Sequence, residues 1–160
     1  MKKTIVGLLC MVGLAACEGI DCTLNNVVAL NIGFYDANGT GVRLADTLMV
    51  TAAGTDSIIF NSGTGVEALG LPMSYEREAD TLVFSFKGQD EEEAREMTLI
   101  VKKTNQWHTE SPDCPVSAFH HLTGIERKGG EGFIDSVVVV NEDVNYAALE
   151  NIRIYLHTAD

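Results

Sequence analysis

The chain has 160 residues, of which 46% are hydrophobic, and 23 acidic residues against 11 basic ones give a formal net charge of −12. This length suits one domain with a full hydrophobic core. The excess of negative charge repels phosphate groups, so the composition argues against nucleic acid as a partner.

Residues 1–16 have the pattern of a bacterial export signal, with Lys2 and Lys3 ahead of an apolar run from Ile5 to Ala16. That run is too short to span a bilayer core of roughly 30 Å as a helix. Removal of the two lysines with the signal would take the formal charge from −12 to −14. The alternative to the lipoprotein signal described next is an ordinary signal peptide, in which Cys17 is incidental and carries no lipid.

The apolar run ends in LAAC, residues 14–17, which resembles a bacterial lipobox. The resemblance implies cleavage before Cys17 and lipid on its thiol, and two or three acyl chains on one residue give firm membrane attachment. We therefore expect a cleaved signal peptide at 1–16, a short lipidated tether at 17–26 and a single β-rich domain at 27–160.

Apolar residues alternate with polar ones through most of the remaining chain, the pattern typical of half-buried strands. About eight short strands separated by Gly, Asn and Asp turns predict an antiparallel β-sandwich, immunoglobulin-like or related. The segment FIDSVVVV, residues 133–140, is apolar on both faces, which predicts a central strand. The alternating positions are Val28, Leu30, Ile32 and Phe34; Leu48 and Val50; Ile58 and Phe60; Leu82, Phe84 and Phe86; Met97, Leu99 and Val101; and Ile152, Ile154 and Leu156.

One segment has helix signals. In PVSAFHHL, residues 115–122, Pro115 suits the first position of a helix and Gly124 suits a stop. The sequence predicts one short helix or 3₁₀ turn there.

The four cysteines have different expected fates. Cys10 leaves with the signal and Cys17 carries lipid, so Cys22 and Cys114 remain in an exported, oxidising compartment, where pairing them is the economical inference. A bridge between them closes a loop of about 90 residues, worth roughly 4–5 kcal/mol on the chain-entropy model. Two separately buried thiols are the alternative.

No pattern for a catalytic site, a cofactor or zinc is found, and the adjacent His120 and His121 make a poor chelating pair because neighbouring residues point to opposite sides. Weak calcium candidates are Asp36, Asn38 and Thr40, which match the first half of an EF-hand loop. The loop lacks the closing glutamate, so a hairpin turn explains it better. The acidic run 90–96 has two interpretations: a cation site or, as we prefer, a solvated hairpin tip.

The triplet Asp-[Ser/Thr]-aliphatic occurs four times, where average residue usage gives roughly half a match. Strand entry explains it, because Asp favours turns and the two following residues favour strands. The hydroxyl positions are Thr47, Ser57, Thr81 and Ser136.

Short segments along the whole chain resemble an uncharacterised family of small envelope lipoproteins of Bacteroidota type, a domain of unknown function. They are LAAC, DCT, NIGFYD, DTLMV, GTDSIIFN, LPM, DTLVFSF, SPDCP, FIDSVVVVNEDV and ENIRIYL. The resemblance implies an outer-membrane lipoprotein, on the periplasmic face or alternatively on the cell surface. Those bacteria attach O-glycans at the triplet just described, which makes its four hydroxyl residues candidate acceptors.

We expect a lipid-anchored, non-enzymatic module that binds or scaffolds another envelope component, a protein or a glycan. One alternative is a carboxylate-dependent hydrolase of envelope polymers, which needs two carboxylates about 5–9.5 Å apart in a pocket. A second alternative is a calcium-dependent, adhesin-like module.

Overall fold

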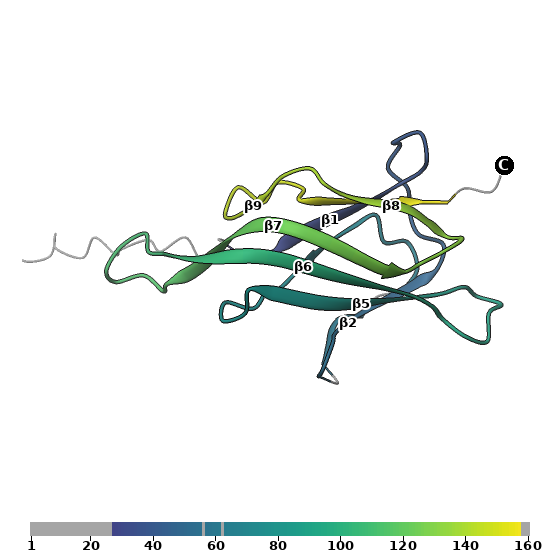
Figure 1. Ribbon diagram of the computed structural model, residues 1–160, viewed down its shortest axis with the longest axis horizontal. Helices are drawn as coiled ribbons and strands as arrows, with labels where there is room; N and C mark the ends of the chain where they lie inside the picture. The colour runs from purple at the N-terminus through teal and green to yellow at the C-terminus, as the bar shows by residue number, and fades with distance from the viewer. Residues whose placement is uncertain (1–26, 56, 62, 158–160) are drawn as a thin grey trace, which may run out of the picture.

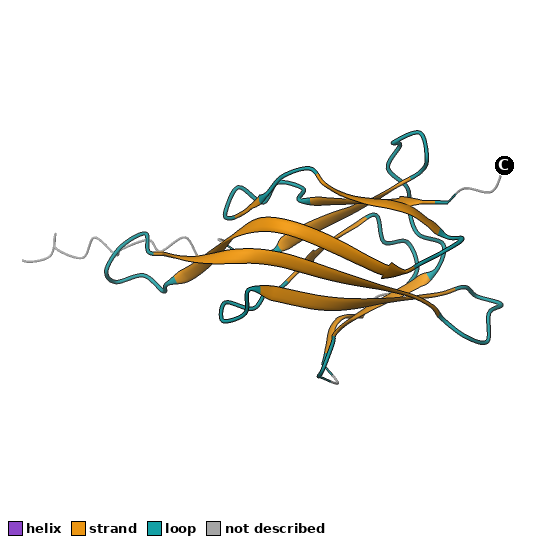
Figure 2. Ribbon diagram, viewed as in Figure 1, coloured by secondary structure: helices purple, strands orange, loops and turns teal. Residues whose placement is uncertain are grey.

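The computed structural model describes residues 27–55, 57–61 and 63–157, and these residues form two packed β-sheets (Figure 1). No helix occurs within these ranges, so the predicted all-β sandwich is confirmed (Figure 2). The strands are β1 Leu30–Tyr35, β2 Thr47–Ala52, β3 Ile58–Asn61, β4 Ala68–Leu71, β5 Ala79–Lys87, β6 Arg95–His108, β7 Ser117–Gly129, β8 Ile134–Val139, β9 Asp143–Val144 and β10 Ile152–Leu156.

The smaller sheet has four strands in the order β4-β1-β10-β8. Its two central strands, β1 and β10, are parallel and come from opposite ends of the domain, with Ile32 opposite Ile152 and Phe34 opposite Ile154. Both outer strands are antiparallel to their neighbours. The sheet therefore closes only when the first and last strands of the described chain meet.

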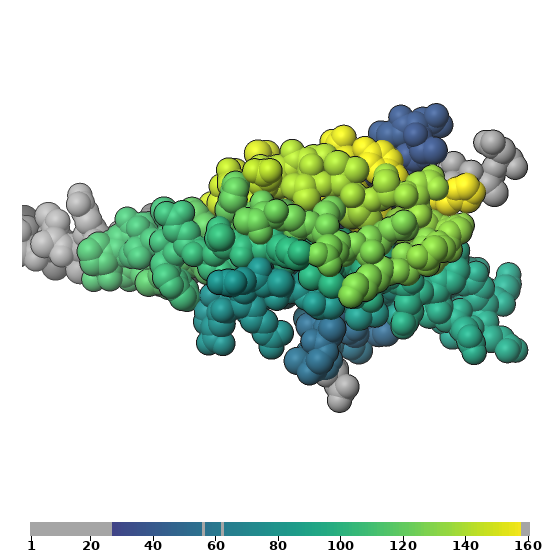
Figure 3. Space-filling view, in the orientation of Figure 1, coloured from purple at the N-terminus to yellow at the C-terminus, as the bar shows by residue number. Residues whose placement is uncertain are grey.

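The larger sheet has six strands in the order β3-β2-β5-β6-β7-β9, all paired antiparallel. Strands β6 and β7 form a long hairpin, whose tip extends past the rest of the described body (Figure 3). A register shift between Lys102 and Lys103 marks a β-bulge in this hairpin.

The core lies between the sheets and is made by the alternating apolar residues of the sequence. Phe34 of the smaller sheet meets Phe86 of the larger one edge to face, with ring centroids 6.3 Å apart. Each buried side chain of this size contributes roughly 1.5–3 kcal/mol of transfer free energy. The innermost residues are Leu30, Ile32, Phe34, Leu48, Val50, Leu71, Phe84, Phe86, Met97, Leu99, Val101, Ile152 and Ile154.

The helix or 3₁₀ turn predicted at 115–122 is wrong: from Ser117 onward this segment belongs to β7. The ladder to β6 continues from Met97 opposite Gly129 to His108 opposite Ser117. Pro115 and Gly124 are local signals, and this long cross-strand ladder outweighs them because helix propensity is only a weak preference. The long β7 and the short β9 raise the strand number above the eight expected.

The central position predicted for residues 133–140 is also wrong, because β8 is the last strand in the order of its sheet. Val138 and Val140 keep 42% and 44% of their surface exposed. A run of valines satisfies strand propensity whether or not both faces are covered, so composition alone did not distinguish a central strand from an edge strand.

Candidate functional site

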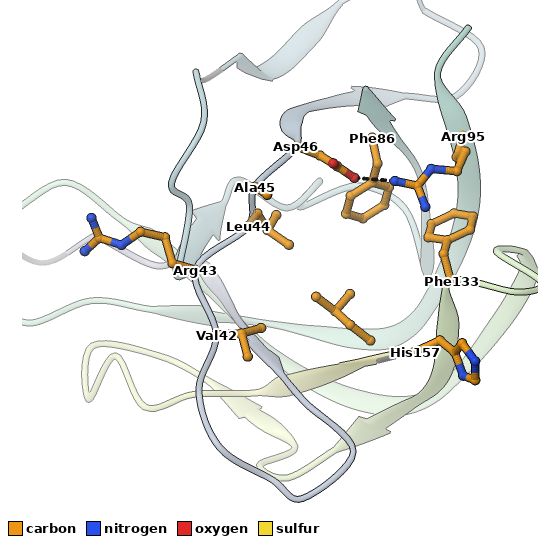
Figure 4. Close-up of a pocket in the computed structure, with 10 residues that line it drawn as sticks. Val42, Arg43, Leu44, Ala45, Asp46, Phe86, Arg95, Phe133 and His157 are labelled. Atoms are coloured by element: carbon orange, nitrogen blue, oxygen red, sulfur yellow. Dashed lines mark hydrogen bonds and ion pairs between the residues drawn. The ribbon is translucent and has the colours of Figure 1, made fainter. Parts of the chain in front are cut away.

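A pocket opens between the two sheets at one end of the sandwich, and it combines apolar walls with a charged rim (Figure 4). We call it the Arg95 pocket. Its volume is about 250 Å³, and its lining residues are Val42, Arg43, Leu44, Ala45, Asp46, Phe86, Arg95, Phe133, Leu156 and His157.

The walls of the pocket come from segments that are far apart in the chain. Phe86 lies on β5, and Phe133 lies in the turn before β8, with the two ring centroids 5.4 Å apart. The turn is held by a hydrogen bond from the N–H of His157 to the carbonyl of Phe133, at 2.9 Å. The loop before β2 supplies Leu44, whose N–H donates to the carbonyl of Val66 at 2.9 Å. These bonds give the pocket a fixed shape.

Arg95 is the cation at the rim of the pocket, and it is already paired. Its Nη2 donates to Asp46 Oδ2 at 2.6 Å, and its Nε lies 3.3 Å from Glu91 Oε2. The guanidinium carbon lies 5.0 Å from the centre of the Phe133 ring, a cation–π contact. Nε makes no hydrogen bond of good geometry among the described residues, so its contact with Glu91 is an ion pair and not a hydrogen bond.

Figure 4 shows Val42, Leu44, Phe86 and Phe133 directed toward the cavity, whereas Arg43 points away from it. The free surface of the pocket is therefore mainly apolar, with the Arg95–Asp46 pair on one side. Its volume is below the roughly 300–1,000 Å³ of most small-molecule sites. A pocket of this size and character suits one apolar side chain or a group of similar size.

A second polar centre is buried in the larger sheet around Lys103, whose side chain is fully buried. Its Nζ donates to the carbonyl oxygens of Ser74 at 2.5 Å and Arg77 at 2.6 Å, and lies 3.3 Å from Asp80 Oδ2. Asp80 in turn accepts the N–H of Ser74 at 3.1 Å. This network fixes the loop between β4 and β5 to the sheet, so we assign it a structural role.

The adjacent histidines point to opposite faces of β7, as expected. His120 is buried, and its Nδ1 lies 2.7 Å from Asn105 Oδ1. Burial and the neighbouring charge of Lys103 lower the pKa of His120 below 6.5. His121 is exposed, and its hydrogen bond with Asp143, at 2.8 Å, raises the pKa of His121 above 6.5.

The calcium candidates lie in a tight turn between Tyr35 and Gly41. Asp36 Oδ1 accepts the backbone N–H of Asn38 at 2.9 Å and that of Thr40 at 2.8 Å. The carboxylate closes its own turn, which explains this polar pattern without an ion. Within the described part of the chain, no group of three or more His, Cys, Asp or Glu side chains is placed to hold a metal.

Most of the acidic run 90–96 lies in the connection between β5 and β6, in agreement with the preferred hairpin-tip interpretation, and its last two residues begin β6. Glu91 folds back within the tip, accepting the N–H of Gly88 at 3.2 Å and pairing with Arg95. The run thus contributes an anion to the rim of the Arg95 pocket.

Two carboxylates do share one concave surface, on the outer face of the smaller sheet. Glu67 and Glu150 both line a hollow there. Each is committed to an ion pair, Glu67 with Arg43 and Glu150 with Arg153, both with a shortest N–O distance of 2.5 Å. A hydrolase of the expected type needs one carboxyl group free to donate a proton.

Cys114 is half-buried in the connection between β6 and β7, whereas Cys17 and Cys22 lie outside the described residues. Lipidation and the disulfide therefore stay predictions. Of the four hydroxyl residues, Thr47 begins β2, Ser57 directly precedes β3, Thr81 lies within β5 and Ser136 lies within β8. Thr47, Ser57 and Ser136 are exposed, and Thr81 is half-buried.

Sequence reasoning missed the residues of the Arg95 pocket, because its parts are brought together only by the packing of the two sheets. It also missed Lys103, although the alternation of residues along β6 indicated that its side chain is buried. Lys103 continues the odd-numbered series of Met97, Leu99 and Val101, which predicts an inward direction for its side chain.

The fold and the pocket define a small, two-layer β-sandwich whose cavity lies where the sheets part at one end. In the described ranges, no helix is long and apolar enough to cross a membrane. The chain belongs to the family of unknown function DUF6452, whose model matches residues 47–156, from the first residue of β2 to the last of β10. No curated protein and no solved structure matches the chain.

Proposed function

We propose that this protein is a lipid-anchored, non-enzymatic binding module of the bacterial envelope, and that the Arg95 pocket receives one apolar side chain of a partner protein. One observation carries the proposal: the pocket is lined mainly by apolar surface, and the charges at its rim, Arg95 and Asp46, are paired with each other. Small, desolvated pockets that receive a single anchor residue supply much of the affinity in protein interfaces.

Site-specific photo-crosslinking in native cells tests this function. A photoreactive amino acid replaces Ala45, an exposed residue of the pocket lining, and the control replaces Lys128, an exposed residue of β7 away from it. We expect one defined protein adduct from position 45 and none from position 128. Val42→Trp, which fills the pocket, should abolish the adduct; equal adducts from both positions, or an adduct that survives the filling, would refute the proposal.

The anchor in this proposal is Cys17, acylated after removal of residues 1–16, as in lipoproteins of Bacteroidota type. The support is the lipobox LAAC at residues 14–17. Metabolic labelling with an alkyne fatty acid should mark the wild-type protein and leave Cys17→Ala unmarked. Labelling of both proteins alike would disprove this attachment point.

We place the folded domain on the periplasmic face of the outer membrane, with display on the cell surface as the alternative. Surface-exposed lipoproteins of the resembled group have an acidic cluster soon after the lipid cysteine. This chain matches that cluster only in part, because Gly19 and Ile20 separate Glu18 from Asp21, and this partial match supports the periplasmic face. Protease added to intact cells should leave the domain whole. Digestion of the domain without lysis would instead support surface display.

Exported proteins of the resembled group carry O-glycans on the triplet found here, and we propose that at least one of its hydroxyl residues is modified. Exposure favours Thr47, Ser57 and Ser136 over Thr81, which lies within β5 and follows the buried Asp80. Intact-mass spectrometry of protein from native envelopes measures this directly. A mass equal to polypeptide plus lipid would refute it.

A further inference from the structure

The outer face of the smaller sheet carries a second preorganised site, independent of the Arg95 pocket. Its centre is Glu150, which precedes β10 and whose carboxylate lies directly over Gly33 of β1. A Cβ atom on Gly33 would lie 2.2 Å from Glu150 Oε2 and 2.9 Å from Tyr35 Cε2. Only a residue without a side chain therefore lets the carboxylate rest against the sheet.

Both oxygens of this carboxylate are held in place. Tyr35 Oη donates to Oε2 at 2.6 Å, and Arg153 Nε donates to Oε1 at 2.5 Å. The hydrogen bond with Glu150 raises the pKa of Tyr35 above 10, so its hydroxyl remains a donor at neutral pH. Because an ionised carboxylate has about four acceptor positions, Glu150 can still accept hydrogen bonds from a ligand.

Aromatic surface lies beside the carboxylate. The Arg153 guanidinium carbon is 4.7 Å from the centre of the Tyr35 ring, and the Tyr35 and Tyr155 rings are 5.8 Å apart. These contacts fix the side chains before any ligand binds, which reduces the entropy lost on binding.

Glu150 stands between two hollows. One, of about 350 Å³, has a floor that includes Ala68 and Gly70, and the other, of about 300 Å³, includes Gly33 and Tyr35. Both lie at the lower end of the roughly 300–1,000 Å³ range of ligand sites, which suits one ring-sized unit in each. The small floor residues let such a unit approach the backbone closely.

The charges decide the class of ligand. Glu150 is neutralised by Arg153, and Glu67, at the edge of the second hollow, by Arg43. The site therefore has no uncompensated charge to attract an ion, while it offers carboxylate acceptors, a phenol and aromatic rings. Those groups match the hydroxyls and the C–H faces of a sugar.

We propose that this face binds a neutral oligosaccharide of at least two units, one in each hollow, with the Glu150 carboxylate accepting hydroxyl hydrogen bonds between them. The site shares Val42 with the Arg95 pocket, and Arg43 of that pocket pairs with Glu67 of the second hollow. Gly33 and Glu150 do not line the Arg95 pocket, so variants at these two positions test this proposal separately.

The test is an array of glycans probed with the full-length protein, with neutral glucans, mannans and chito-oligosaccharides beside sialylated and sulfated glycans. We expect binding to a neutral class, followed by a dissociation constant from titration with the best soluble oligosaccharide. Gly33→Ala displaces the Glu150 carboxylate without removing it and should weaken binding at least tenfold. Glu150→Gln keeps the shape of the side chain but removes the carboxylate, and it should also weaken binding at least tenfold.

Gly124→Ala is the matched control, because Gly124 lies in β7 of the other sheet and its added Cβ meets nothing within 4 Å. It should bind like the wild type, and thermal melting should show that all variants fold. Absence of binding to every neutral glycan, preference for acidic glycans, or wild-type affinity in Gly33→Ala and Glu150→Gln would each overturn the proposal.

Discussion

The buried lysine of β6 allows a quantitative test of the sandwich. In Lys103→Met the apolar stem stays, but the carbonyl of Ser74 loses the Nζ donor and Asp80 loses the cation 3.3 Å from its Oδ2. Removing one partner of a buried ion pair costs about 3–5 kcal/mol, since the other charge stays buried without compensation. Against a total stability of roughly 5–15 kcal/mol, that is a large loss.

The assay is urea unfolding followed by circular dichroism, with thermal melting as a second measure. At roughly 2–4 °C per kcal/mol for a domain of this size, Lys103→Met should lower Tm by about 6–20 °C. The control is the neighbouring Lys102→Met, which removes a half-exposed pair with Glu126 and should change stability by no more than about 1 kcal/mol.

The double variant Asp80→Leu with Lys103→Met removes both charges and should be more stable than Lys103→Met alone, because no unpaired charge remains. The reasoning fails if Lys103→Met is no more destabilising than Lys102→Met. It fails also if the double variant is the least stable of the three.

Three further predictions concern pH, redox state and calcium. NMR titration should give His120 a pKa below 6.5 and His121 a pKa above 6.5, and equal values would contradict both assignments. The contribution of neutral His120 to stability is then lost as pH falls below 6.5, whereas the contribution of protonated His121 is lost as pH rises through its raised pKa. If the predicted bridge exists, Cys114→Ser and reduction of the wild type should lower the free energy of unfolding alike, by up to roughly 4–5 kcal/mol. Adding Cys22→Ser to Cys114→Ser should then cause no further loss. Because Asp36 already closes its own turn, EGTA should leave the melting midpoint unchanged, and a rise on addition of calcium would show that the turn holds an ion.

The strands that could be predicted from sequence are those whose alternation is set by burial on one face. Leu82, Phe84 and Phe86 are an example, since each is buried against the core. Of the residues between them, Val83 is half-buried, and Ser85 is buried but donates a hydrogen bond to Glu96. The sandwich class followed from repeating this pattern. The parallel pairing of β1 with β10 could not be predicted, because nothing in either strand specifies a partner about 120 residues away.

The functional surfaces were harder to predict, for a physical reason. The Arg95 pocket requires the loop before β2, the start of β6 and the end of β10 to meet, and each contributes residues that are ordinary in isolation. Gly33 in β1 carried a usable signal, because a glycine inside a strand weakens it unless something approaches the backbone closely. The carboxylate of Glu150 is what approaches.

The central pair of the smaller sheet has a consequence for synthesis. Residue 32 pairs with residue 152, so β1 can pair with β4 early but has to wait for the last strand before the hydrogen bonds along its other edge can form. Contacts this distant in sequence form late and slowly. In a chain that emerges from the ribosome in order, the smaller sheet therefore stays incomplete, and the core between the sheets stays partly uncovered, until its final strand is made. The family match, which begins at residue 47, omits β1, so a protein produced from those boundaries alone would lack a central strand of its smaller sheet.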